Sequence, residues 1–244
     1  MILRGVAHPE RIIPDETSPG IIAVHLKRYA FAKPWCDGRR VLDAACGVGY
    51  GSAFLAEGAA SVVGVDISAD TIDYARRRYG LPNLAFVAGD VTALPFDDRS
   101  FDAVCSFETI EHVDEPAVAI REAARVVTAD GVYVVSTPKA DATTRSPANP
   151  FHLVELSQAD FEQTLRESFR EVEVYGQRRL QTRRHRALQR LDVLGLRRRL
   201  PGLRAAAKVV GTPRMSELTL DDLVIERSGL EQADDLVAVC RAPR

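Results

Sequence analysis

Short apolar segments alternate with amphipathic segments along most of this chain, and this alternation limits the fold more than any other feature. Strands are expected at 40–44, 61–66, 84–88, 101–107, 131–137, 171–175 and 235–241. Helices are expected at 21–33, 49–57, 69–78, 116–126 and 157–168. Nearly continuous apolar strands separated by helices are typical of a parallel sheet that is covered on both faces. The sequence therefore predicts an α/β fold with a seven-stranded, mostly parallel sheet.

The length of 244 residues fits one large domain with a substantial core. We expect an N-terminal arm and helix at 1–38, with Pro34 and the Asp37-Gly38 pair marking a break after the helix. A cofactor-binding core is expected at 39–176, a basic helical insertion or lid at 177–233, and the final strand at 234–244.

The predicted insertion concentrates positive charge. Residues 178–214 hold twelve Arg or Lys and one acid, Asp192, so the rest of the chain carries a net charge of −13. Leucine and valine lie between the arginines, which is typical of helices with one apolar face. Three interpretations stay open: nucleic-acid binding, contact with an anionic membrane, and a solvated lid. The segment has no aromatic residue for base stacking, which disfavours nucleic acid.

Cysteine usage and hydropathy indicate the cellular compartment. The four cysteines are widely spaced and form no Cys-x-x-Cys pair, so neither a disulfide framework nor structural zinc is expected. The first residues lack the apolar stretch of a secretory signal, and no run of 18 apolar residues occurs. These features predict a cytoplasmic protein without a transmembrane helix.

A strand, a glycine-rich turn and a helix follow one another at 41–51, where the sequence is VLDAACGVGYG. Glycines let backbone approach a ligand closely, and a helix N-terminus offers unpaired N–H groups. Asp66 ends the second strand, where an acid accepts hydrogen bonds from ribose hydroxyls. Asp90 follows the third strand and is suited to an adenine amino group. The turn begins with an acid, Asp43, and its glycines, Gly47, Gly49 and Gly51, are two residues apart. Both features differ from the pyrophosphate-binding fingerprint of dinucleotide enzymes.

These pieces, together with VVGVDIS, AGDVTALPF, FDAVCSFETIEHV and GVYVVSTP, resemble the class I S-adenosylmethionine-dependent methyltransferases. The resemblance covers roughly residues 40–140 and implies a Rossmann-like fold with S-adenosylmethionine as cofactor. It implies that Asp43 and Gly47 line the methionine end, Asp66 the ribose, and Asp90 with Val91 the adenine. The full predicted cofactor set is Asp43, Ala45, Cys46, Gly47, Gly49, Asp66, Ile67, Asp90, Val91 and Phe107. Ala45 departs from the family, which usually has a glycine there.

Two carboxylates and an imidazole occur together in Glu108-Thr-Ile-Glu111-His112. Their spacing fits one face of a helical turn, and His152 follows the fifth predicted strand. This pattern resembles metal-dependent O-methyltransferases that act on small-RNA 3′ ends and on ubiquinone catechol intermediates. By that resemblance Glu108, Glu111, His112 and His152 hold Mg²⁺ or Mn²⁺, and His112 and Glu111 are catalytic. The alternatives are that His112 is a metal-free base or that it has no catalytic role.

The stretches 10–14 (ERIIP) and 25–29 (HLKRY) resemble bacterial sugar-tailoring methyltransferases. We therefore predict metal-assisted O-methylation of a sugar hydroxyl in a vicinal diol, in glycan or natural-product biosynthesis. The acceptor is a small molecule or a glycan, with a lipid-linked glycan at a membrane surface as one option. The alternatives are RNA ribose 2′-O-methylation, amino-sugar N-methylation, and a cofactor-binding protein without catalysis. His8, His25 and His185 are expected at the surface or in packing.

Overall fold

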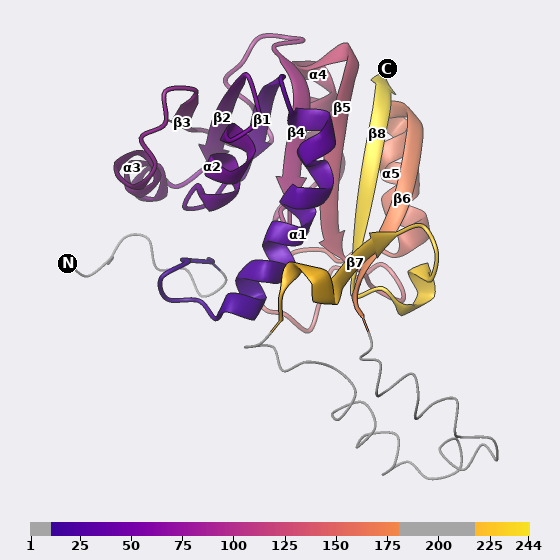
Figure 1. The fold of residues 1–244 in the computed structure, drawn as a ribbon. Coiled ribbons are helices and arrows are strands. Elements are labelled where there is room, and N and C mark those ends of the chain that lie inside the picture. Colours follow the sequence, from indigo (N-terminus) through magenta and orange to yellow (C-terminus); the bar gives the residue numbers. More distant parts are fainter. Residues whose placement is uncertain (1–10, 181–217) are drawn as a thin grey trace, which may run out of the picture.

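A computed structural model describes residues 11–180 and 218–244 of the protein (Figure 1). One eight-stranded sheet has the order β3-β2-β1-β4-β5-β8-β6-β7. Its strands are β1 (Arg40–Ala44), β2 (Ser61–Asp66), β3 (Leu84–Ala88), β4 (Phe101–Phe107), β5 (Val127–Pro138), β6 (Phe169–Arg179), β7 (Leu223–Glu226) and β8 (Asp235–Pro243). The helices are α1 (Pro19–Cys36), α2 (Tyr50–Ala56), α3 (Ala69–Arg78), α4 (Pro116–Val126) and α5 (Gln158–Ser168), and short 3₁₀ turns occur at η1 (Ile110–His112), η3 (Leu220–Asp222) and η4 (Leu230–Gln232).

Neighbouring strands in the first half of the sheet, from β3 to β5, are parallel. Strand β8 lies antiparallel between β5 and β6, and β7 pairs antiparallel with β6 at the edge. Because β1, β2 and β4 are parallel, their carboxyl ends meet at one edge of the sheet. Ligands of open α/β sheets bind at such an edge.

Each face of the sheet has its own helices and its own apolar core. Helices α1 and α2 contribute Ala32 and Leu55 to one cluster, together with Val41 and Cys105 of the sheet. Helices α4 and α5 pack against the opposite face, where Leu42 and Tyr133 are buried. Successive residues Val41 and Leu42 therefore point to opposite faces, as the period of a β-strand requires. The prediction of helices on both faces is confirmed.

Several details differ from the sequence-based expectation, and the following affect the architecture. The described sheet has eight strands rather than seven, because 223–226, expected within a helical insertion, form the edge strand β7. Strand β6 also continues to Arg179, three residues into the range expected to be helical. Residues 181–217, which hold most of the basic segment, lie outside the described residues. Pro34 does not end α1, since the last turn is held against the core by the buried side chain of Cys36.

No helix in 11–180 or 218–244 combines the length and apolar character needed to cross a bilayer. All four cysteines are buried and reduced, and Cys36 Sγ lies 3.8 Å from Cys105 Sγ between α1 and β4.

Candidate active site at the carboxyl end of the sheet

A cavity of about 770 Å³ opens at the carboxyl ends of β1, β2 and β4. Twelve of the predicted site residues line it: Ala45, Cys46, Gly47, Asp66, Ile67, Asp90, Val91, Phe107, Glu108, Glu111, His112 and His152. The glycine-rich turn and the Glu/His residues therefore face one space, although they are about sixty to a hundred positions apart in the chain. A volume of this size accommodates a drug-sized ligand.

The glycine-rich turn lines this cavity with Ala45, Cys46 and Gly47. Ala45, Gly47 and Gly49 all have positive φ angles, of 62°, 55° and 86°. Ala45 therefore bears a conformation that costs an L-residue roughly 1–2 kcal/mol and that glycine adopts freely. Gly49 is the N-cap residue of α2 and does not line the cavity, and a Cβ there would lie 2.6 Å from the Phe86 ring. Its contribution is to let the turn pack against β3.

Asp66 is the acid at the end of β2. Its Oδ2 accepts a hydrogen bond from the Gly47 N–H at 3.1 Å, and its Oδ1 accepts one from the Ser68 N–H at 2.9 Å. Arg11 Nη2 lies 3.6 Å from Oδ1. Each carboxylate oxygen has a second lone pair, so the group keeps acceptor capacity for ligand hydroxyls.

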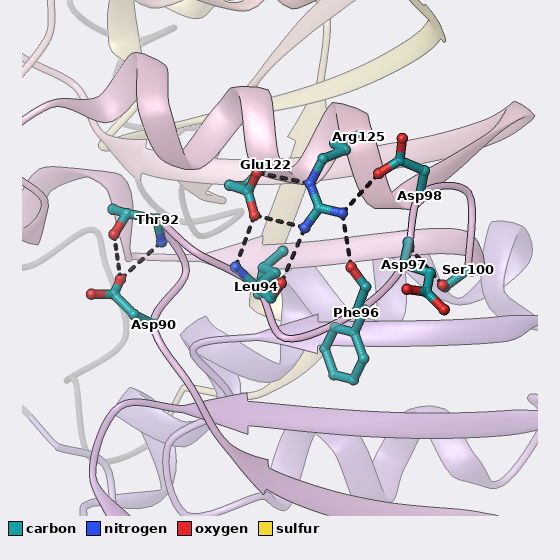
Figure 2. A network of polar contacts seen from close by, with 9 residues as sticks. All are labelled: Asp90, Thr92, Leu94, Phe96, Asp97, Asp98, Ser100, Glu122 and Arg125. Atoms are coloured by element: carbon teal, nitrogen blue, oxygen red, sulfur yellow. Dashed lines mark hydrogen bonds and ion pairs between the residues drawn. The ribbon is translucent and has the colours of Figure 1, made fainter.

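The loop after β3 carries Asp90, and two residues of α4 fix its course (Figure 2). The Arg125 guanidinium donates to the carbonyls of Leu94 and Phe96, at 3.0 and 2.8 Å, and Glu122 accepts from the Leu94 N–H at 2.8 Å. Asp90 itself accepts from the N–H and hydroxyl of Thr92, which closes the first turn of the loop. This local structure holds Asp90, Val91 and Thr92 against the cavity.

Asp43 differs from its predicted role, because it is fully buried and does not line the cavity. Ser52 Oγ donates to Oδ2 at 2.6 Å, and the Tyr29 hydroxyl donates to Oδ1 at 3.1 Å. Burial raises the pKa of Asp43 to about 7, although both hydroxyls oppose the shift. The carboxyl group joins α1 and α2 to β1 directly beneath the glycine-rich turn, which assigns it a positioning role.

Glu111 and His112 lie in the turn η1, and His152 lies in the segment before α5. Ligand atoms of Glu111, His112 and His152 all lie within 4.8 Å of one another. The N–H groups of Leu153 and Val154 both donate to the Glu111 carbonyl, at 2.7 and 3.2 Å, which holds the two segments together. The two imidazole rings meet edge to face, with centroids 5.0 Å apart.

Glu111 is the buried member of this group. Its Oε2 accepts from Thr137 Oγ1 at 3.1 Å, whereas its Oε1 is buried without a hydrogen-bond partner in the described part of the chain. Burial, followed by the nearby charge of Glu108, raises its pKa well above the ordinary value. A buried acceptor atom left unpaired is costly, so the site favours a proton or a cation at this position.

Each histidine has its Nδ1 next to an acceptor oxygen. His112 Nδ1 lies 3.0 Å from the Phe151 carbonyl, and His152 Nδ1 lies 2.7 Å from Glu155 Oε1. A carbonyl only accepts, so a neutral His112 carries its proton on Nδ1 and keeps a lone pair on Nε2. For His152 the same tautomer leaves Nε2 to accept from the Asn149 amide at 2.9 Å. Metal-binding histidines usually have one nitrogen oriented in this way by a carbonyl or a carboxylate. For His152 to bind a metal through Nε2, the ion would have to replace the Asn149 amide.

Glu108 is not part of the Glu111–His112–His152 group, although the sequence placed it there. Ser136 Oγ donates to its Oε1 at 2.8 Å, and Arg28 Nη2 lies 3.3 Å from its Oε2. The backbone at Glu108 is left-handed (φ 51°), so it precedes η1 and does not share a helical face with Glu111. Glu108 lines the cavity as the counter-ion of Arg28.

Arg28 links α1 to β8 through an ion pair with Asp235. Its side chain is 1% exposed, and Nη2 donates to Asp235 Oδ2 at 2.7 Å. His25 Nδ1 lies 3.4 Å from Arg28 Nη1, and burial followed by this positive charge lowers the pKa of His25 to about 3. His25 therefore lines the cavity as a neutral imidazole, which its sequence context did not indicate.

Part of this chain is similar to a known protein family. Residues 42–135 match the family model described as "Methyltransferase domain". This part of the chain is therefore similar to a methyltransferase domain. A Mycolicibacterium smegmatis protein named "Probable S-adenosylmethionine-dependent methyltransferase" is 38% identical over 141 residues, which are 57% of this chain and 54% of that protein. A "Fatty-acid O-methyltransferase" of the same organism is 35% identical over 123 residues, 49% of this chain and 45% of that protein.

The chain spans about half the length of the curated relatives it matches. A solved structure supports the fold over a longer range. The crystal structure of a Thermotoga maritima S-adenosylmethionine-dependent methyltransferase, described there as a possible histamine N-methyltransferase, superposes with a TM-score of 0.63 and covers 91% of each chain. The identity is 18%, so this likeness concerns the methyltransferase fold alone.

Several residues that line the cavity were not predicted from sequence. Arg11, Ile12 and His25 reach the cavity from the N-terminal part of the chain, and Phe151 and Leu153 flank His152. The loop residues carry no periodic signal. The stretches 10–14 and 25–29, which resemble sugar-tailoring enzymes, were the available indication that this region contributes to the site.

Replacing Asp43 by asparagine should flatten the dependence of domain stability on pH. The pKa of Asp43 is raised by burial from 3.8 to about 7, so protonation favours the folded state. Its contribution to stability is therefore complete below the unfolded pKa and is lost as pH rises to about 7. Each pKa unit corresponds to about 1.4 kcal/mol, which sets an upper limit of roughly 4 kcal/mol across this window.

Urea unfolding of the ligand-free protein at pH 5 and pH 7.5 measures this difference. The exposed carboxylate Asp97 provides the control variant, Asp97→Asn, which should retain the wild-type slope. If the unfolding free energy changes equally between pH 5 and pH 7.5 in the wild type and in Asp43→Asn, Asp43 does not have the raised pKa assigned to it.

Proposed function

We propose that this protein transfers the methyl group of S-adenosylmethionine to a hydroxyl oxygen of an acceptor bound beside Glu111, His112 and His152. The observation that carries the proposal is the shared cavity. The same space of about 770 Å³ is lined by the glycine-rich turn, by Asp66 and Asp90, and by these three residues. S-adenosylmethionine carries its methyl group on a positively charged sulfur. The acceptor oxygen attacks the methyl carbon in line with the carbon–sulfur bond, and S-adenosylhomocysteine leaves as that bond breaks.

Asp66 and the loop of Asp90 are the residues we assign to the adenosine part of the cofactor. Asp66 retains unused lone pairs for ribose hydroxyls, and Asp90 lies where an adenine amino group can donate to it. Gly47 offers close backbone approach at the methionine end. Without a metal, His112 is the candidate base: it lines the cavity and its Nδ1 is engaged by the Phe151 carbonyl, so Nε2 is the ring nitrogen that would accept the hydroxyl proton.

A divalent cation fits the group of Glu111, His112 and His152. The unpaired buried oxygen of Glu111 and the oriented imidazoles support a metal at this position. When bound, such an ion lowers the pKa of a coordinated hydroxyl. Because Glu108 is held by Arg28, the donor set is one carboxylate and two imidazoles. Imidazole suits transition metals, whereas Mg²⁺ prefers oxygen donors, so we propose Mn²⁺ in preference to Mg²⁺.

For the acceptor, we propose a vicinal diol of a sugar, since two neighbouring hydroxyls chelate one ion. A second candidate is an acceptor with an apolar body. Phe151 and Leu153 are large apolar side chains that are 40% and 47% exposed and lie on either side of His152 in the cavity wall. One relative is named for fatty-acid O-methylation. Amino sugars and binding without catalysis have no comparable support in the described site, and the ribose at an RNA 3′ end, which is also a vicinal diol, has only that shared chemistry in its favour.

Calorimetry tests the core of the proposal. S-adenosylhomocysteine should bind the chelator-treated protein with saturation, and Mn²⁺ should then bind the saturated protein more tightly than Mg²⁺. Absence of S-adenosylhomocysteine binding would refute methyl transfer, whereas cofactor binding without Mn²⁺ binding would leave His112 as a metal-free base.

Methyl transfer to methyl α-D-glucopyranoside, 1,2-decanediol and decanoic acid then separates the acceptor classes. Transfer to the glucoside alone supports the sugar diol. Preference for decanediol over the glucoside supports an apolar body attached to a diol, and transfer to decanoic acid alone contradicts the diol in both forms.

A further inference from the structure

The segment before α1 forms one wall of the cofactor cavity. Arg11 and Ile12 line the cavity beside Asp66, and Ile13 is 6% exposed and packs on Val48 of the glycine-rich turn. This contact places the N-terminal segment against the part of the domain that we assign to S-adenosylmethionine.

Local hydrogen bonds fix the course of this segment. The N–H groups of Glu16 and Thr17 both donate to the Ile13 carbonyl, at 2.9 and 2.8 Å, and the Ile13 N–H donates to Thr17 Oγ1 at 3.1 Å. Helix α1 begins two residues later, at Pro19. The backbone of residues 13–17, which connects Arg11 to α1, is therefore held by this turn and by the packing of Ile13 on Val48.

Arg11 and Asp66 form a partly buried ion pair, with side chains that are 17% and 11% exposed. At 3.6 Å the two groups attract each other, and the hydrogen bonds of Asp66 come from Gly47 and Ser68. A charge pair at low exposure is screened less than a surface pair, so the attraction holds the guanidinium and the Asp66 carboxylate side by side. Arg11 consequently stands at the same carboxylate that a ribose diol would use.

We propose that Arg11 closes the adenosine end of the cofactor cavity and, through its ion pair, positions the Asp66 carboxylate for the ribose hydroxyls. This inference rests on the proposed use of S-adenosylmethionine. The ligand chemistry that Arg11 recognises is the ribose of an adenosine, through the shared carboxylate, and its positive charge complements Asp66 and not the sulfonium. Its effect should therefore appear with adenosine-containing ligands whether or not they carry a methyl group.

Calorimetric titration of S-adenosylhomocysteine into Arg11→Gln should show an affinity about tenfold weaker than that of the wild type. The matched control is Arg78→Gln, because Arg78 lies 3.9 Å from Asp15 of the same segment but both side chains are more than half exposed. The control should bind within twofold of the wild type. Adenosine should show the same loss in Arg11→Gln, and an Asp66→Ala background should reduce that loss to less than threefold.

The outcomes separate this inference from the proposed function. If the wild type does not bind S-adenosylhomocysteine, the proposed function is refuted. If the wild type binds and Arg11→Gln binds within twofold or more tightly, Arg11 does not position Asp66 for the cofactor. An equal loss in Arg78→Gln would likewise overturn the inference, since it would indicate a general disturbance of the segment. Circular dichroism of each variant verifies that the fold is retained.

Discussion

Replacing Glu111 by glutamine should reduce methyl transfer by at least 100-fold while leaving the affinity for S-adenosylhomocysteine within threefold. The carboxylate is 1% exposed and has one buried oxygen without a hydrogen-bond partner in the described residues. Glutamine is nearly isosteric and retains an acceptor for Thr137, but it has no negative charge to hold a cation. The loss is therefore expected in metal binding and in turnover, and not in the cofactor site.

Mn²⁺ titration and a transfer assay with the panel acceptor that the wild type methylates measure both effects. Glu115→Gln is the control, because Glu115 is an exposed acid four positions away that pairs with Arg145. Glu108→Gln distinguishes the three-residue site from the four-residue site predicted by the sequence. If Glu108 acts only as the counter-ion of Arg28, this variant keeps Mn²⁺ binding that Glu111→Gln loses. Full activity in Glu111→Gln would contradict a role for this carboxylate in either metal binding or proton transfer.

The sequence predicted most of the sheet because strand and helix signals are local. Strands β1 to β4 and helices α3 and α4 begin and end as expected, since each is a short apolar run or an amphipathic repeat. Strand β7 was missed because its four residues, LVIE, are too few to predict a strand beside a strongly basic segment. The pairing of β7 with β6 depends on a partner more than forty residues away.

The candidate site was predictable where its residues follow motif spacing, and unpredictable where distant charges decide. The turn at Ala45–Gly49 and the acids Asp66 and Asp90 follow strand ends, so their common location follows from topology. The separation of Glu108 from Glu111 depends instead on Arg28, which is held by Asp235, 207 positions along the chain from it. No local pattern in the sequence encodes that contact. Burial likewise turned Asp43 from a predicted ligand contact into a support of the turn.

The buried guanidinium of Arg28 also leads to the largest expected change in stability. Arg28→Met should lower the free energy of unfolding by roughly 3–5 kcal/mol at pH 7.5, because it leaves Glu108 and Asp235 without their cation. Arg40→Met is the control: Arg40 pairs with Asp102, but its side chain is 52% exposed, and such surface pairs contribute about 0–1 kcal/mol. Urea unfolding at constant ionic strength compares the two variants.

The charge explanation predicts how this loss depends on pH and how it is reversed. Burial already raises the pKa of Glu108 to about 6 against the attraction of Arg28, so removing that cation raises its pKa further. Protonation of Glu108 then favours the folded variant, and the deficit relative to the wild type should shrink as the pH falls from 7.5 to 5. Adding Glu108→Gln and Asp235→Asn to Arg28→Met removes the uncompensated charges and should restore more than half of the lost stability. If the deficit is constant with pH and is not reversed by these substitutions, Arg28 stabilises the fold through the packing of its side chain between α1 and β8. Its charge would then not be what holds Glu108 away from Glu111, His112 and His152.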